Sequence, residues 1–166
     1  MSQAPNTLIS RPDVSGPNAP EFDAIAKHAK DNFGYLNFTV FEWIEDRFAL
    51  RRIWSSDPKD YPVNGEKVMP KEAPWPNTVI KQHKSHVSWN SSEIKSTYND
   101  YQALFDLGVH QTLSIPILDE KNEKVIGALN YSAGENQYNE NTLKEMEKIA
   151  QNEAKQAFLK WQSNQK

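Results

Sequence analysis

The chain has 166 residues, of which 37% are hydrophobic and 25% are charged, and its net charge is −3. This length suits a single domain whose core is large enough to fold without covalent or metal cross-links. The mixed charge gives no basic surface for nucleic acid, and no apolar run of about 18 residues could cross a membrane, so we expect neither as a partner.

The amino-terminal residues predict a flexible arm followed by a helix. Residues 1–18 contain three prolines and few apolar groups, and they lack the apolar core of a secretory signal, so we expect a cytoplasmic protein. The domain should occupy residues 19–163, with a short tail at 164–166. Apolar residues at helical spacing predict the first helix, which Gly34 should end: Phe22, Ile25, Ala26, Ala29 and Phe33.

Two strands and a long proline-rich segment come next. Residues 35–44 alternate and are rich in aromatic and β-branched side chains, and residues 48–55 read as the returning strand. Residues 56–76 contain five prolines. Because proline lacks a backbone donor, this segment should be a loop. Tyr61 and Trp75 are apolar anchors that favour an ordered loop covering the sheet.

The second half predicts short elements, then a hairpin and a long helix. A short helix should span 75–83 and a short strand 86–89. Ser96 is a candidate cap for a helix that Gly108 ends. The last three predicted elements are strands at 109–118 and 124–133, joined by a charged turn, and a helix from Asn139 to about Gln162.

Strands that follow one another through short turns predict a mostly antiparallel sheet in an α+β fold. The first and last helices carry apolar stripes, so they should cover one face. The loop and the short helices are left to cover the other face.

Three stretches resemble a GAF domain: FTVFEW, GVHQTLSIPILDEKNEKVIGALNYSAGE and NENTLKEMEKIAQ. The pattern IPIL, turn, VIGALNY is the most specific part, and the resemblance covers about residues 20–162. It implies a small-molecule sensing fold with a ligand pocket on one sheet face, and it implies dimers formed through the terminal helices.

The sequence departs from three chemically defined branches of that family. The chain contains no cysteine, so it lacks the thiols through which free methionine-R-sulfoxide reductases act and bilin chromophores are attached. Cyclic-nucleotide binders carry an NKFDE-type motif. Here Asn130 matches its first position, but Tyr131 replaces the lysine.

The last two strands should present one apolar and one polar face. Thr112, Ser114 and Pro116 alternate with larger aliphatic residues, and Asn130 lies with Ala128 and Ser132 on the corresponding face. Small polar groups suit a ligand pocket. The alternative is that this face meets solvent or packs beneath a helix.

We therefore expect a ligand site whose hydrogen bonds come from His110, Thr112, Ser114 and Asn130. Tyr61 and Trp75 would supply its aromatic walls, unless they only pack in the core. His110 could instead be held at the end of the sheet by backbone hydrogen bonds. Arg51 and Arg52 point to opposite faces, so one of them could reach an anionic ligand; the alternative is a surface pair.

The sequence offers no metal centre and no catalytic motif. His83 and His86 have a chelating spacing, but no cysteine or acidic cluster completes a ligand set, so we expect no metal and no cofactor. No nucleophile elbow or glycine-rich phosphate loop is present.

The apolar stripe of the terminal helices predicts a homodimer interface that includes Phe22, Ile149, Phe158 and Trp161. The alternative is that these residues pack on one another within the chain. The function expected is a non-catalytic sensor that binds a small polar or anionic metabolite and signals to a partner protein. A cysteine-free enzyme of GAF type and a structural dimerisation module remain as alternatives.

Overall fold

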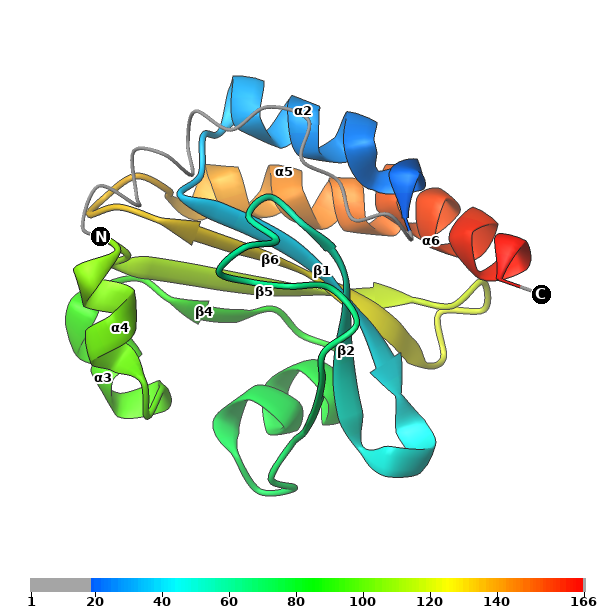
Figure 1. The fold of residues 1–166 in the computed structure, drawn as a ribbon, viewed down its shortest axis with the longest axis horizontal. Helices are drawn as coiled ribbons and strands as arrows, with labels where there is room; N and C mark the ends of the chain where they lie inside the picture. Colours follow the sequence, from blue (N-terminus) through cyan, green and yellow to red (C-terminus); the bar gives the residue numbers. More distant parts are fainter. Residues whose placement is uncertain (1–18, 166) are drawn as a thin grey trace.

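The computed structural model describes residues 19–165, and the expected arm at 1–18 lies outside them. Figure 1 shows the elements, which follow one another as η1 (Pro20–Phe22), α2 (Asp23–Asn32), β1 (Asn37–Ile44), η2 (Glu45–Arg47), β2 (Ala49–Ser55), β3 (Glu66–Val68), η3 (Pro76–Lys81), β4 (His86–Ser88), α3 (Ser91–Thr97), α4 (Tyr101–Asp106), β5 (Gln111–Leu118), β6 (Val125–Ala133), α5 (Glu140–Gln151) and α6 (Glu153–Asn164).

The strands of the described chain form one six-stranded sheet in the order β3-β2-β1-β6-β5-β4. Every neighbouring pair is antiparallel, which confirms the predicted sheet. The first strand of the chain and the last therefore lie side by side at its centre. The pairing of β1 with β6 joins the two halves of the chain into one unit.

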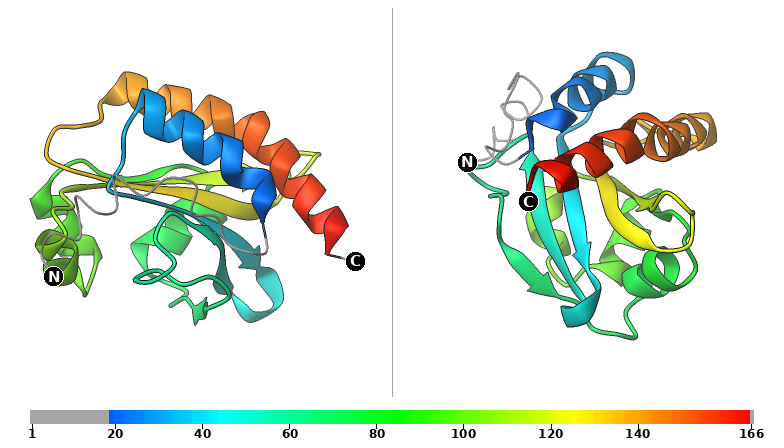
Figure 2. Two further views of the ribbon diagram at one scale, coloured as in Figure 1. Left: turned by 45° about the horizontal axis from the view of Figure 1, so that its top comes forward. Right: turned by 90° about the vertical axis from the view of Figure 1, so that its right-hand side faces the viewer.

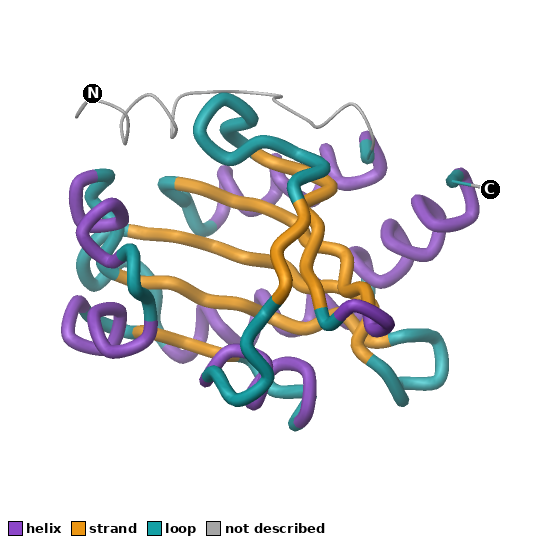
Figure 3. The backbone as a smooth tube through the Cα atoms, turned by 60° about the horizontal axis from the view of Figure 1, so that its bottom comes forward, coloured by secondary structure: helices purple, strands orange, loops and turns teal. Residues whose placement is uncertain are grey.

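The helices divide between the two faces of the sheet as predicted. Figures 1 and 2 show α2, α5 and α6 together on one face, while η3, α3 and α4 lie on the other. Figure 3 shows the second face, with α3 and α4 at one end of the strands. The largest apolar cluster lies beneath the terminal helices and includes the aliphatic face of β5, namely Leu113, Ile115 and Ile117.

Local signals for helix ends are largely confirmed. Asn139 caps α5, and its side chain and that of Thr142 each accept a hydrogen bond from the other residue's backbone. Gly34 and Gly108 follow helices with φ of +72° and +83°, a conformation that glycine adopts without strain.

Three elements differ from the sequence prediction. Residues 66–68, expected in the loop, pair with β2 as strand β3, because no proline interrupts the chain between Pro62 and Pro70. The helix expected after Ser96 is two short helices, and Asn90 caps the first by accepting from the Glu93 amide. The last helix is interrupted at Asn152, where φ is −116° and ψ is −87°, and α6 then ends at Asn164.

The aromatic rings expected at a dimer interface are buried inside the chain. Phe22 and Phe158 are fully buried and meet edge to face at 6.0 Å, and Phe158 meets Trp161 at 5.4 Å. Ile149 is only 7% exposed. This packing matches the alternative that the apolar stripe packs within the chain. These side chains join the N-terminal helical segment to α6. A homodimer stays a prediction, and it would need another surface of the chain.

Within residues 19–165, no helix has both the length and the apolar character needed to span a bilayer.

Candidate functional site

The register of the sheet places polar side chains in a row across five strands. Residues directly opposite one another in neighbouring strands point to the same face. Thr39 of β1 lies opposite Ser55 and Asn130, and Ser114 of β5 lies opposite Asn130 and His86. The row therefore reads Ser55, Thr39, Asn130, Ser114 and His86, on the face away from the terminal helices.

A second polar row lies beside the first, two residues further along each strand. It consists of Asn37, Ser132, Thr112 and Ser88. We call the two rows together the polar band. All of its members are buried or half-buried, so the interpretation of this face as a solvent-facing surface is wrong.

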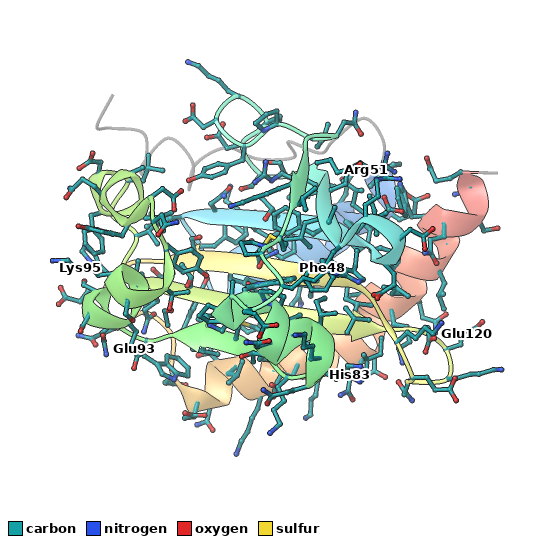
Figure 4. The ribbon with its side chains drawn as sticks, turned by 90° about the horizontal axis from the view of Figure 1, so that it is seen from below. Phe48, Arg51, His83, Glu93, Lys95 and Glu120 are labelled. Carbon is teal, nitrogen blue, oxygen red and sulfur yellow. The ribbon has the colours of Figure 1, made fainter. Side chains whose placement is uncertain are left out.

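Apolar clusters lie at both ends of the polar band. At one end, Trp43, Trp75 and Val79 pack with Ala128 beneath η3. At the other end, Leu36, Ile94 and Val109 pack beneath α3 and α4. Figure 4 views the molecule from this side, with η3 in front of the sheet. A band of polar groups between apolar walls is the usual composition of a small-molecule site.

Some polar groups of the band are satisfied within the protein. The Ser114 hydroxyl donates to the Asn130 carboxamide oxygen, and the Ser56 hydroxyl donates to Asn37 Oδ1 at 2.8 Å. The Thr112 hydroxyl lies 3.3 Å from that of Tyr98. The bond from Ser114 fixes the orientation of the Asn130 side chain, because it holds the carboxamide oxygen.

Three groups of the band are buried without a hydrogen-bond partner: His86 Nδ1, Ser88 Oγ and Asn130 Nδ2. His86 and Ser88 lie two residues apart on one face of β4, and Ser114 alone separates His86 from Asn130 in the first row. Leaving such a group unsatisfied costs about 1–3 kcal/mol. Three of them, on strands β4 and β6 with only β5 between, therefore mark a place where a polar ligand would gain most.

Burial lowers the pKa of His86 below its ordinary value, so the imidazole is neutral near pH 7. A neutral imidazole offers one donor and one acceptor. The hydrogen-bonding groups of the polar band are therefore uncharged near pH 7.

The structure brings Thr112, Ser114 and Asn130 together as predicted, but it places His110 elsewhere. The His110 Nδ1 atom lies 2.6 Å from the Ser91 hydroxyl, and its ring stacks on Phe105 at 5.5 Å. His110 is thus held at the end of the sheet, its ring against α3 and α4 by side chains and its backbone amide by donating to the Ala133 carbonyl oxygen at 2.8 Å. The histidine in the row with Ser114 is His86.

The two predicted aromatic walls differ in their surroundings. Trp75 is 7% exposed and packs with Trp43, so it belongs to the apolar cluster that closes one end of the band. Tyr61 instead lies over the guanidinium of Arg52, whose carbon is 5.4 Å from the ring centre. Burial raises the pKa of Tyr61 to about 12, so its phenol is protonated.

Two cavities of about 360 Å³ each lie outside the polar band. One is between α2 and the α5–α6 pair, and the other is beside His83 at the edge of β5. Across residues 19–165, no group of three or more His, Cys, Asp or Glu side chains could hold a metal ion.

Sequence reasoning missed half of the polar band, although the signal was present. In NFTVF, Asn37, Thr39 and Phe41 alternate with apolar residues, and in HVS, His86 and Ser88 flank Val87. The same alternation that singled out Ser114 and Asn130 was available in both strands. Only the register between strands shows that these residues share one surface.

Comparison with protein-family models gives no match, and comparison with curated proteins gives none either. Solved structures do match. The GAF domain of a two-component sensor histidine kinase from Bacillus halodurans superposes with a TM-score of 0.67 at 13% identity, covering 88% of this chain and 96% of that one. The GAF domain/HD domain protein from Geobacter sulfurreducens gives 0.67 at 9% identity, covering 86% and 92%.

A third match is the type II free methionine-R-sulfoxide reductase from Thermoplasma acidophilum, with a TM-score of 0.61 at 8% identity, covering 93% of this chain and 94% of that one. Sensor domains and an enzyme thus share this architecture. The element order, the antiparallel sheet and these superpositions together show that the chain has the GAF fold.

Proposed function

We propose that this chain is a non-catalytic sensor that binds a small polar metabolite on the polar band and reports its presence to a partner protein. One observation carries the proposal. His86 Nδ1, Ser88 Oγ and Asn130 Nδ2 are buried and unpartnered on one sheet face, on strands β4 and β6, which only β5 separates. A ligand that bonds to them would recover free energy that the unliganded protein forgoes.

The arrangement of the helices supports a sensing role. The short helices α3, α4 and η3 lie on the ligand side of the sheet, while α2, α5 and α6 lie on the other side (Figure 1). Binding that shifts the short helices would act through the sheet on the terminal helices. A sensor histidine kinase is among the proteins whose GAF domain has this fold, which agrees with such a role.

The hydrogen bonding of the polar band argues against nucleophilic catalysis. The Ser114 hydroxyl donates to the amide oxygen of Asn130, and an amide cannot accept the proton as a general base would. The chain also has no cysteine. We therefore favour binding over turnover.

A thermal-unfolding screen tests the proposal. The panel contains nucleotides, inorganic anions, amino acids, sulfoxides and small aromatic acids. A ligand present at about 100 times its dissociation constant should add about 2.7 kcal/mol of stability. For a domain of this size, that is a rise in melting temperature of about 5–11 °C.

The double variant Ser114→Ala, Asn130→Ala should abolish that rise while keeping the fold, as judged by circular dichroism. The matched control is Ser92→Ala, Asn99→Ala, which removes the same two residue types from exposed positions and should keep the rise. A ligand that stabilises both double variants equally would refute the polar band as its site, and turnover of any hit would favour the enzyme.

A further inference from the structure

Arg52 of β2 lies at the border of the polar band and its guanidinium is held in place from three sides. It lies opposite Phe41, on the same sheet face as the band and one row away from Thr39. Its guanidinium carbon is 5.1 Å from the centre of the Phe41 ring and 5.4 Å from that of Tyr61. Its Nη1 donates to the Pro62 carbonyl oxygen at 3.0 Å. The plane and direction of the guanidinium are therefore fixed.

Among residues 19–165, the remaining edge of the guanidinium, Nε and Nη2, donates no side-chain hydrogen bond. Nε is buried without a partner, and no described carboxylate forms an ion pair with Arg52. Burial acts against the charged form and lowers the pKa of Arg52, yet an arginine stays protonated in proteins. A half-buried cation without a counter-ion is costly to keep in a folded protein.

Two nearby arginines show what this edge does when a carboxylate is present. Arg47 uses the same two atoms, Nε and Nη2, to hold Glu66 at 2.7 and 2.9 Å. Arg51, the chain neighbour of Arg52, binds Glu42 at 2.7 Å. Both are paired at the surface. Arg52 is the one of the three that faces the polar band, and it is the one left unpaired.

We propose that Arg52 anchors an oxyanion of the ligand, a carboxylate or a phosphate, through its Nε–Nη2 edge. This inference rests on the proposed function, because it names the chemistry of the same ligand. A planar two-atom donor pair fits two oxygens of such a group, and the charge makes these hydrogen bonds stronger than neutral ones.

The spacing of the sheet sets the size of the ligand. Strand β1 separates β2 from β6, so Arg52 and Asn130 stand on strands about 10 Å apart. A metabolite with an anionic group at one end and hydrogen-bonding groups at the other spans that distance. The ligand class is therefore a small polar oxyanion rather than a neutral or cationic compound.

The test measures binding of inorganic phosphate and of acetate by thermal unfolding, at constant ionic strength with chloride as the reference salt. The wild type should be stabilised by one of the two anions over chloride, and which one distinguishes phosphate from carboxylate. Arg52→Gln should weaken that binding about tenfold or more, the effect of losing a charged hydrogen bond. The control Arg51→Gln, at the adjacent position on the opposite face, should bind as the wild type does.

Arg52→Lys covers the case in which Arg52→Gln does not fold, because it keeps the charge and removes the paired donors. It should fold with an unchanged circular dichroism spectrum and bind the anion more weakly than the wild type. Stabilisation no greater than that by chloride, or binding by Arg52→Lys equal to that of the wild type, would overturn the proposal.

The outcome can be separated from that of the proposed function. A neutral metabolite that stabilises the wild type, fails with Ser114→Ala, Asn130→Ala and is indifferent to Arg52→Gln would leave the sensor standing and refute the oxyanion anchor. Anion binding that needs Arg52 but no panel hit that needs Asn130 would refute the polar band as the site and keep the anchor.

Discussion

Gly127 is a position at which the fold leaves no space for a side chain. A Cβ atom there would collide with the backbone oxygen of Phe41 and with the ring of Phe158, whose Cζ atom would be 2.9 Å away. Gly127→Ala should therefore lower the free energy of unfolding by about 1–3 kcal/mol or more, as overpacked sites do. The control Gly65→Ala meets nothing within 4 Å and should change it by less than about 0.5 kcal/mol. Urea denaturation measures both, and equal effects would contradict the packing described.

His86 should make the stability of the protein depend on pH on the acid side of neutrality. Burial lowers its pKa in the folded state below the ordinary value of 6.5, so the unfolded chain takes up the proton first as the pH falls. The contribution of neutral, buried His86 to the free energy of unfolding is present above about pH 6.5 and is lost as the pH falls below that value.

Unfolding free energies measured between about pH 7 and about pH 5 should fall more steeply for the wild type than for His86→Asn. His28→Asn, which changes an exposed histidine, is the control and should keep the slope of the wild type. Parallel curves of unfolding free energy against pH for the wild type and His86→Asn would contradict a lowered pKa of His86 in the folded protein.

Individual site residues could be predicted only as far as strand alternation reaches. Alternation in β5 and β6 assigned Ser114 and Asn130 to one face, and the structure places them opposite each other. It could not choose between His110 and His86, because that choice depends on where β4 pairs along β5. Arg52 was recognised as one of two candidates, but its lack of a carboxylate partner is a property of the folded chain alone.

At the scale of elements, α6 holds the terminal helices to the sheet through its aromatic side chains. Phe158 is fully buried between Phe22 and Trp161. Phe158→Ala should lower the free energy of unfolding by about 3–5 kcal/mol, the usual cost of such a cavity. Leu159→Ala, at the neighbouring half-buried position, should cost less.

The loss of unfolding free energy in Phe158→Ala should be the same at two protein concentrations that differ tenfold. The reason is that the contacts of Phe158 lie within one chain. A melting temperature of the wild type that rises with concentration, with a rise that Phe158→Ala removes, would instead place this side chain in an interface.

The positions of most helices and strands could be predicted from local sequence signals, while the breaks within them could not. The Asn139 cap and the glycines at 34 and 108 are local signals, and each is found at a helix end. The break at Asn152 lies within a continuous apolar stripe, so no periodicity marks it. Strand β3 has all three of its residues exposed, and such a short edge strand carries almost no pattern.

At the scale of the molecule, the sheet separates the side that carries the polar band from the side that the terminal helices cover. The short helices enclose the polar band at both ends, and the terminal helices cover the opposite face (Figure 2). The order of elements alone predicted these layers, because antiparallel strands joined by short turns leave few other arrangements. Under the proposed function, the ligand would be selected by the few unpartnered groups between the layers.

The most direct test is a crystal structure of the protein with the strongest hit from the thermal screen. We predict that the ligand lies on the polar band, with polar atoms within hydrogen-bond distance of Asn130 Nδ2 and His86 Nδ1. Ligand density confined to the cavity between α2 and the α5–α6 pair, or to the cavity beside His83, would contradict it.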